Sequence, residues 1–341
     1  MTTDAAHDAP RRERLARWAA ERHGLAPGSL DLRLAAGDAS FRRYFRLTLP
    51  DGATRILMDA PPEQEDSRPF VAIARRWEAA GLPVPHLFAD DLAAGFLELE
   101  DLGDTPLQRR FDDEEATAAW LERAIGLIHA LQNRAGPDDL PRYDAALLGR
   151  ELDLFPEWCL GEWLGLAPPP GWAALRRALI DAALAQPLVT VHRDFDAMNL
   201  MVRDDSLVLI DFQDAVAGPI TYDLVSLLRG RYRRLDAEAF AAHVEAFRRR
   251  AVDDGRLPAA TDPAGFLARA DAMAAQRSLK VLGIFCRLTL RDHRTGYLER
   301  LPHFLAHLED SLAGLGGHDA FQAWLAGTFR PALAARLEGT P

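Results

Sequence analysis

Apolar and polar residues alternate in short runs over the first hundred residues, and this period of two is typical of β-strands. Asp51-Gly52 between two of these runs is a typical hairpin turn. The spacing of apolar residues widens to the helical period at 11–23 and again at 68–80. The pattern predicts an N-terminal helix followed by a small antiparallel sheet. The second helix comes between the third and fourth strands of this sheet. The predicted strands are 30–34, 41–49, 55–59, 86–90 and 95–100.

Helical periodicity dominates the chain beyond Asp113. It is interrupted by an apolar, β-prone run at 188–191 and by a hairpin pattern over 200–202 and 207–210. We therefore expect an α+β, bilobal fold, with a small antiparallel-sheet lobe over 1–101 and a mostly helical lobe over 102–341. The predicted helices are 114–133, 143–163, 172–185, 222–232, 237–251, 263–290 and 301–312.

The composition is that of an ordinary globular protein, with 48% hydrophobic and 27% charged residues in 341. The net charge of −11 argues against a nucleic-acid partner, because a phosphate backbone requires a basic face. No apolar run is long enough to cross a bilayer, and the first residues lack a secretory signal core, so we expect no membrane partner and a cytoplasmic location. Cys159 and Cys286 are expected to be buried thiols.

A short motif in the middle of the chain carries the strongest chemical signal. The tripeptide His-Arg-Asp at 192–194 follows an apolar run, an asparagine comes five residues later, and Asp-Phe at 211–212 ends the predicted hairpin. This spacing is typical of the catalytic loop and metal-binding turn of a kinase. Transfer of a phosphoryl group from ATP needs a carboxylate to orient the attacking hydroxyl, and oxygen ligands to hold Mg²⁺ against the phosphates. We expect Asp194 to be the catalytic base and Asn199 and Asp211 to bind Mg²⁺; alternatively, Asp194 and Asn199 only cap turns.

The segment after the first predicted strand is a candidate for the phosphates of ATP. A turn of small residues there can bring backbone N–H groups near phosphate oxygens, which makes Gly37, Ala39 and Ser40 candidate ligands. Any hairpin turn can have the same composition, so the motif is weak by itself.

The phosphate-binding lysine of kinases has no counterpart in the expected strand, where Met58 stands, and the only lysine of the chain is Lys280. Three arginines follow the small-residue turn instead. Alternation places Arg42 and Arg46 on one face of the strand and Arg43 on the other. The sequence favours Arg43 as the phosphate ligand, and the alternative is that all three arginines are solvated.

The remaining candidates concern adenine and the phosphate acceptor. Backbone groups of Glu100 to Leu102 lie where a linker between lobes would meet the adenine edge. A mixture of acids, arginines and aromatic residues is typical of sugar sites, and it occurs around Arg150 and Glu151. Asp214 is a candidate for substrate hydroxyls and Arg287 for an acidic substrate group. The alternatives are a surface helix for the first pair and a salt-bridged helix face for Arg287.

Two further residues of the central region have structural interpretations. His192 is expected to fix the backbone of the loop rather than to act in catalysis. Asp223 is expected to anchor the N-terminus of a helix.

Taken together, these motifs resemble the aminoglycoside phosphotransferase and choline kinase superfamily. Within it, six segments resemble the anomeric N-acetylmuramate/N-acetylglucosamine kinases of bacterial cell-wall recycling. They are GDASFRRYFR at 37–46, LMDAPPEQEDSRPFV at 57–71, RELDLFPEW at 150–158, VHRDFDAMNLM at 191–201, LIDFQDAVAGPITYDLVSL at 209–227 and LKVLGIFCRL at 279–288.

The resemblance implies a protein-kinase-like fold and ATP- and Mg²⁺-dependent phosphorylation of an amino sugar at its anomeric hydroxyl, giving an α-1-phosphate. A uridylyltransferase would then be the next enzyme to use the product. The family also carries methionine at the position of Met58, so the missing lysine does not imply an inactive enzyme. Family members often carry Pro-Arg before the asparagine, whereas Ala197 and Met198 stand there in this chain, so a sugar contact from that arginine has no counterpart here.

Two other functions stay open at this point. A kinase for a cationic acceptor, such as an aminoglycoside or choline, would need a dense acidic pocket, and the available arginines Arg150 and Arg287 argue against it. A catalytically silent nucleotide-binding adaptor is compatible with the missing lysine, but the complete set of Asp194, Asn199 and Asp211 argues against it.

Overall fold

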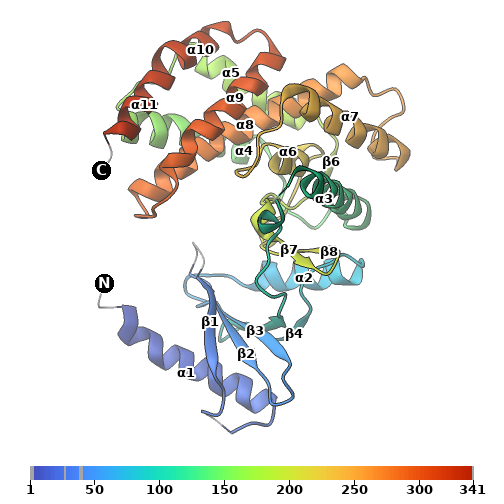
Figure 1. The fold of residues 1–341 in the computed structure, drawn as a ribbon, viewed down its shortest axis with the longest axis vertical. Helices are drawn as coiled ribbons and strands as arrows, with labels where there is room; N and C mark the ends of the chain where they lie inside the picture. The colour runs from blue at the N-terminus through green and yellow to red at the C-terminus, as the bar shows by residue number, and fades with distance from the viewer. Residues whose placement is uncertain (1–3, 27, 38–40, 112, 340–341) are drawn as a thin grey trace. The chain divides into compact units, whose positions relative to one another are not determined.

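The computed structural model of the chain describes residues 4–26, 28–37, 41–111 and 113–339 (Figure 1). Their contacts divide the chain into two compact units, and the first unit is discontinuous in sequence. It combines Met1–Arg109 with Leu200–Asp214, and the second combines Arg110–Asn199 with Ala215–Pro341. The functional boundary expected between residues 101 and 102 stays a prediction.

The first unit is built on a five-stranded antiparallel sheet with the strand order β1-β2-β3-β5-β4. Each strand that the sequence predicts is present, which confirms the small antiparallel sheet. Direct pairing of Arg43 with Asp59, and of Tyr44 with Met58, defines which side chains share a face of the sheet. The strands are β1 Leu32–Gly37, β2 Arg43–Thr48, β3 Thr54–Asp59, β4 Leu87–Asp91 and β5 Phe96–Glu100.

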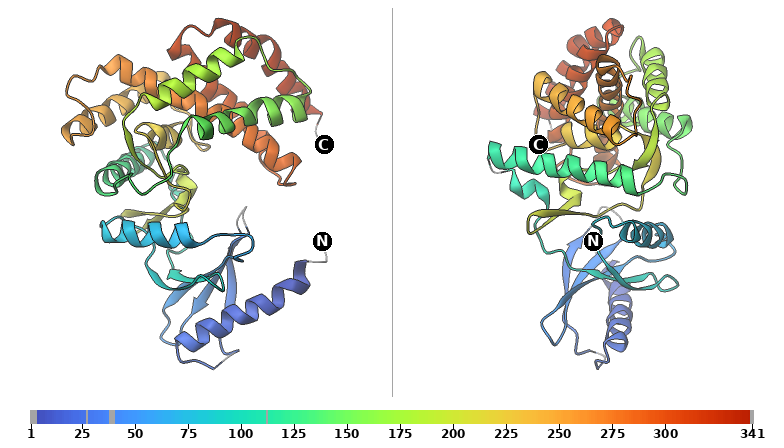
Figure 2. Two further views of the ribbon diagram at one scale, coloured as in Figure 1. Left: turned by 180° about the vertical axis from the view of Figure 1, so that it is seen from behind. Right: turned by 90° about the vertical axis from the view of Figure 1, so that its right-hand side faces the viewer.

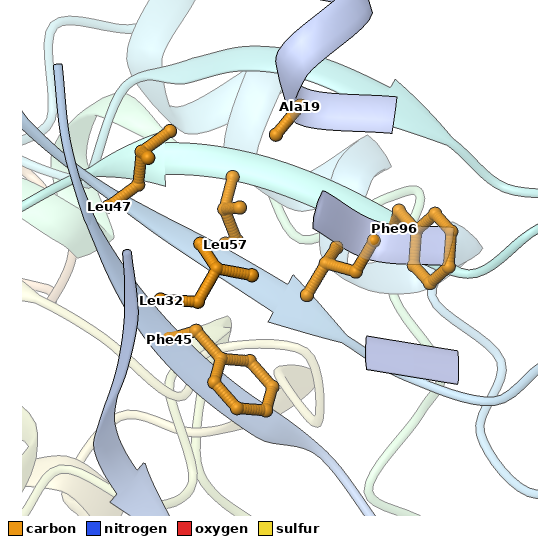
Figure 3. Packing of buried hydrophobic residues seen from close by; sticks show 7 residues of the cluster. Ala19, Leu32, Phe45, Leu47, Leu57 and Phe96 are labelled. Carbon is orange, nitrogen blue, oxygen red and sulfur yellow. The ribbon is translucent and has the colours of Figure 1, made fainter. Parts of the chain in front are cut away.

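Helix α1 (Asp4–Arg22) packs its apolar stripe against one face of this sheet. Figure 3 shows Ala19 of the helix with Phe45, Leu57 and Phe96 from three different strands. These positions alternate along their strands with residues of the other face, as the period of two requires. The helix begins at Asp4 rather than at residue 11, and it ends one residue before the predicted end at 23.

The first unit also contains α2 (Arg68–Ala79) and the hairpin of β7 (Leu200–Arg203) and β8 (Ser206–Leu209), which was predicted. The Leu209 N–H donates to the Pro83 carbonyl oxygen at 2.8 Å, and the Val202 N–H donates to the Thr105 carbonyl oxygen at 2.8 Å. Phe212 then stacks on Phe70 of α2, with ring centroids 4.8 Å apart. These contacts place the segment that ends in Asp211 in the first unit.

The second unit is mostly helical, as predicted. Helix α8 (Pro263–Leu290) has the predicted bounds and packs against α4, α5, α7 and α9 (Figure 2). No helix among the described residues is both long and apolar enough to span a membrane. Cys159 and Cys286 are buried free thiols, as predicted. The other predicted helices are α3 Glu114–Arg134, α4 Ala145–Leu154, α5 Trp172–Leu184, α6 Tyr222–Leu228, α7 Ala237–Asp253 and α9 Leu301–Leu315.

Several elements of the second unit differ from the predictions. The helix expected to run to residue 163 changes at Phe155–Leu164 into a π-helix, where Pro156 cannot donate a backbone hydrogen bond. Helix α6 ends at Leu228 instead of residue 232. Strand β9 (Val216–Pro219), which was not predicted, pairs with β6 (Leu188–Val191). The C-terminal α10 (Asp319–Trp324), the π-helix Leu325–Phe329 and α11 (Arg330–Glu338) were also not predicted.

Close packing at Gly283 leads to a stability prediction. A Cβ at this position of α8 would lie 2.4 Å from the Leu154 carbonyl carbon, where the α4 backbone cannot move aside easily. We expect Gly283→Ala to lower the free energy of unfolding by about 2 kcal/mol or more, since overpacking costs roughly 1–3 kcal/mol. Gly126 of α3 has no atom within 4 Å of such a Cβ.

The matched control is therefore Gly126→Ala, which we expect to stabilise the protein by about 0.5–1 kcal/mol through helix propensity. Urea unfolding of both variants followed by far-UV circular dichroism measures the difference. Equal effects of the two substitutions would contradict the packing seen at Gly283.

Candidate active site

The backbone of the loop after β6 is held by a buried carboxylate. Asp223 of α6 accepts the His192 N–H at 2.8 Å and the Arg193 N–H at 3.1 Å. Arg193 has a φ of 77°, a conformation that is uncommon for residues other than glycine. Burial raises the pKa of Asp223 to about 7, and the two backbone N–H groups act in the opposite direction. Asp223 thus anchors the loop after β6, a role that differs from the helix anchor expected from the sequence.

The side chain of Arg193 is fixed in a buried charge cluster, which we define as Glu151, Arg193 and Lys280. The Glu151 carboxylate accepts Arg193 Nη2 at 2.7 Å and Lys280 Nζ at 2.9 Å. Lys280 also donates to the Tyr222 hydroxyl at 3.0 Å. Burial alone would raise the pKa of Glu151, but the charges of Lys280 and Arg193 outweigh it and lower this pKa to about 2. The cluster therefore stays charged at neutral pH and ties the loop to α4 and α8.

Loss of the lysine from this cluster should be costly. We expect Lys280→Met to lower the free energy of unfolding by about 3 kcal/mol, because removing one partner leaves the buried charge of Glu151 poorly compensated. Arg249→Met removes a cation from an exposed i,i+4 pair with Glu245 and should cost about 0.5 kcal/mol or less. Urea unfolding at pH 7 compares the two; equally small losses would contradict a stabilising role of the cluster.

Asp194 and Asn199 lie in the same loop of the second unit. The Asn199 Nδ2 amide donates to the Asp194 carbonyl oxygen at 3.0 Å, which closes the loop and determines the orientation of the amide. The Asp196 N–H donates to the same carbonyl oxygen at 2.9 Å. The Asp194 side chain is half-buried. The loop thus carries a carboxylate and an oriented amide close together in sequence and structure.

Asp211 lies in the first unit, at the end of the hairpin. Its φ is 63°, so its backbone is in the left-handed region, and the Gln213 Nε2 amide donates to its Oδ1 at 2.7 Å. Phe212, which is fully buried between Phe70 and Trp77, fixes this turn. A carboxylate and an amide oxygen are donors that suit Mg²⁺, so Asp211 and Asn199 fit this ion chemically. Their roles as metal ligands stay a prediction.

The expected phosphate-binding segment is only partly described. Gly37 is the last residue of β1 and pairs with Arg43 across the hairpin, whereas Ala39 and Ser40 lie outside the described residues. Met58 is fully buried in β3 and pairs with Leu97 of β5. The structure thus places an apolar side chain at the position where kinases carry lysine.

Arg43 and Arg46, two of the three arginines that follow the turn, have different surroundings. Arg43 Nη2 donates to Asp59 Oδ2 at 2.5 Å, on the sheet face that α1 covers. Arg46 forms hydrogen bonds with Asp101 and Asp104, and these raise its pKa. The phosphate contact of Arg43 stays a prediction, although its face of the sheet argues against it.

The segment expected to bind adenine continues from β5. The Glu100 N–H already donates to the His86 carbonyl oxygen at 2.9 Å, and its side chain pairs with Arg203. Adenine binding by the backbone of Glu100 to Leu102 stays a prediction. The Glu100 N–H group already has a backbone partner.

The four candidates for substrate contacts differ in burial and in the unit to which they belong. Arg150 is exposed, and Glu151 is buried in the charge cluster, where its oxygens already have partners. Asp214 is exposed in the first unit, while Arg287 is half-buried on α8. Burial and the neighbouring Arg291 lower the pKa of Arg287. Their substrate contacts stay predictions, and the surroundings of Glu151 favour a structural role.

The partners of the loop after β6 were not predicted from the sequence. The isolation of Lys280 among many arginines was a usable signal, because a lysine retained once in a chain rich in arginine suggests a specific contact. Nothing in the local pattern indicates that Glu151 and Asp223 form hydrogen bonds with this loop, since their partners Arg193 and His192 lie 42 and 31 residues away in the sequence.

Comparisons with known proteins agree with the motifs. The family described as "Phosphotransferase enzyme family" matches residues 31–262. Two relatives, both named N-acetylmuramate/N-acetylglucosamine kinase, come from Pseudomonas putida and Neisseria meningitidis. The first is 40% identical and covers 82% of this chain and 83% of its own length. The second is 39% identical, and the match covers 82% of this chain and 84% of the relative's length.

Solved structures confirm the predicted protein-kinase-like fold. A choline/ethanolamine kinase family protein from Mesorhizobium loti matches 95% of this chain and 100% of its own, with a TM-score of 0.58 and 18% identity. The ADP-bound aminoglycoside phosphotransferase APH(2'')-Ib matches 90% of this chain and 99% of its own, with a TM-score of 0.55 and 12% identity. At these identities the likeness concerns the fold alone.

Proposed function

The chain belongs to the phosphotransferase enzyme family, and from this membership we propose that it is an ATP-dependent kinase that phosphorylates N-acetylmuramate or N-acetylglucosamine at the anomeric hydroxyl. The observation that carries the proposal is identity of 38–40% to three relatives of that name, over more than four fifths of the chain. The intact Asp194, Asn199 and Asp211 support an active enzyme rather than a silent adaptor.

Asp194 is the residue that acts on the acceptor. Its carboxylate accepts a hydrogen bond from the anomeric O1–H and then the proton. O1 forms a bond to the γ-phosphorus of ATP while the bond from that phosphorus to the bridging oxygen breaks, and ADP leaves. Most of the rate enhancement comes from positioning of the two substrates. The anchored loop supports this role, because Asp223 and the charge cluster hold the backbone that carries Asp194.

Asn199 and Asp211 would hold Mg²⁺ at the phosphates. When bound, the ion neutralises developing charge on the phosphate oxygens. The chain contributes oriented oxygen donors: the Asn199 amide is fixed by the Asp194 carbonyl oxygen, and the Asp211 carboxylate is fixed by Gln213.

The product would be a sugar α-1-phosphate. A uridylyltransferase is the class of enzyme that would use it, because such a phosphate is the substrate for making a nucleotide-activated sugar. We also propose a cytoplasmic location, because the proposed reaction consumes ATP.

Phosphorus NMR of the reaction products is the direct test. We expect a sugar-1-phosphate signal after incubation with Mg²⁺, ATP and either N-acetylmuramate or N-acetylglucosamine. A parallel panel contains choline, ethanolamine and an aminoglycoside. A signal only from a member of this panel would replace the proposed acceptor, and ATP binding without any product would favour a silent nucleotide-binding protein.

A further inference from the structure

A kinase without a lysine on β3 must obtain its phosphate-binding cation from elsewhere. In protein kinases that lysine pairs with phosphates and also with a glutamate of the following helix. Met58 stands in its place, and the one lysine of the chain lies in the charge cluster of the second unit. The candidates for a replacement are the arginines at the start of β2, and assigning this role to one of them rests on the proposed function.

The two faces of the sheet separate these arginines. Arg43 is directly opposite Asp59, on the face that carries Phe45 and Leu57 and is covered by α1. Tyr44 is directly opposite Met58, on the other face. Arg42 immediately precedes β2, and alternation continued by one residue directs its side chain to the side of Tyr44 and Met58.

A second observation comes from the partner of Arg42. Its Nη2 lies 3.4 Å from Glu65 Oε2, and Glu65 Oε1 accepts the Phe41 N–H at 3.3 Å. Glu65 lies between β3 and α2, three residues before the helix begins. Arg42 and Glu65 thus form a cation–carboxylate pair on the Met58 side of the sheet, next to the helix that follows β3. This pair is chemically similar to the lysine–glutamate pair of protein kinases, but its cation precedes β2 instead of lying on β3.

Arg42 lies immediately before β2 and is largely buried. Gly37 pairs with Arg43 across β1 and β2, so Arg42 belongs to the connection between these strands. The sequence predicts that the small-residue turn after β1, most of which lies outside the described residues, covers the phosphates. The Arg42 side chain is only 7% exposed and that of Glu65 18%, so the pair forms part of a built site rather than a solvated surface.

We propose that Arg42 binds the phosphates of the nucleotide in place of the missing lysine, and that Glu65 is its positioning residue. A guanidinium carries five N–H donors in a geometry that matches carboxylate and phosphate oxygens. Arg46 shares the face but is held by Asp101 and Asp104 at the far end of the strand.

Binding of ADP and of adenosine, measured by calorimetry in the presence of Mg²⁺, tests this assignment. We expect Arg42→Met to weaken ADP binding by roughly 10- to 100-fold, since charge-assisted hydrogen bonds are lost. Adenosine lacks phosphates, so its affinity should change by no more than about twofold. Arg42→Lys should recover most of the ADP affinity, and Glu65→Gln should weaken ADP in the same direction as Arg42→Met but less.

Arg43→Met is the comparator, because it removes the same side chain from the opposite face. The assignment would be overturned if Arg43→Met, and not Arg42→Met, lost the preference for ADP over adenosine. It would also be overturned if Arg42→Met lowered the affinities for ADP and adenosine equally. Thermal unfolding of each variant monitors folding, and Arg42→Gln replaces Arg42→Met if the latter does not fold. Sugar phosphorylation by the wild-type protein is measured in parallel, and its absence would refute the proposed function. The ratio of the affinities for ADP and adenosine tests the role of Arg42 separately.

Discussion

Asp194→Asn should lower kcat by about 10²–10⁴-fold, the usual contribution of a positioned general base. Asparagine has nearly the same shape as aspartate but cannot accept the proton of the sugar hydroxyl. ATP affinity should stay near that of the wild type, since the proposed role of Asp194 concerns the acceptor. Steady-state kinetics with a coupled ADP assay gives kcat, and calorimetry gives the affinity for ATP.

The control for this substitution is Asp205→Asn, in the exposed turn of the β7–β8 hairpin. It makes the same chemical change outside the proposed machinery and should leave kcat within about twofold, as expected for an exposed surface site. Turnover close to the wild-type rate in Asp194→Asn would rule out this residue as the base.

Removal of the proposed metal ligand in the first unit should also have a large effect on turnover. We expect Asp211→Ala to lower Mg²⁺-dependent turnover by about 10³-fold or more, because charge stabilisation by a bound metal is worth several kcal/mol. Turnover measured over a range of Mg²⁺ concentrations is the readout. Gln213→Ala removes only the hydrogen bond that orients the carboxylate, so its loss should be smaller.

A titration with Mg²⁺ distinguishes the two variants further. Gln213→Ala should approach a plateau at higher Mg²⁺ concentration than the wild type, since its carboxylate is retained but less well oriented. If Asp211→Ala keeps wild-type turnover at any Mg²⁺ concentration, Asp211 is not a metal ligand of the reaction.

Much of the fold follows from local patterns. Helix α8 has the predicted bounds because helical periodicity, a Pro near its start and a long uninterrupted apolar stripe all agree. The strands of the first sheet and the β7–β8 hairpin follow from alternation and turn residues in the same way. The motif from 192 to 212 also predicts the chemistry, since its residue types and spacing fit one reaction.

The missed features depend on residues far away in the chain. Strand β9 contains Gly218 and Pro219, which disfavour a strand locally, yet it pairs with β6 through tertiary context. The sequence favoured Arg43 for the phosphates because alternation cannot show which face a helix covers. That information comes from Asp59 and α1, which place Arg43 on the covered face.

The discontinuous first unit has a practical consequence for anyone who wishes to produce it alone. A truncated gene product ending at Arg109 would lack the hairpin and Phe212, so Phe70 and Trp77 would lose their aromatic cover. Uncovered aromatic surface of this kind promotes aggregation. An independently soluble version would need residues 200–214 grafted after residue 109 through a designed linker, and simple deletion libraries should fail to recover one.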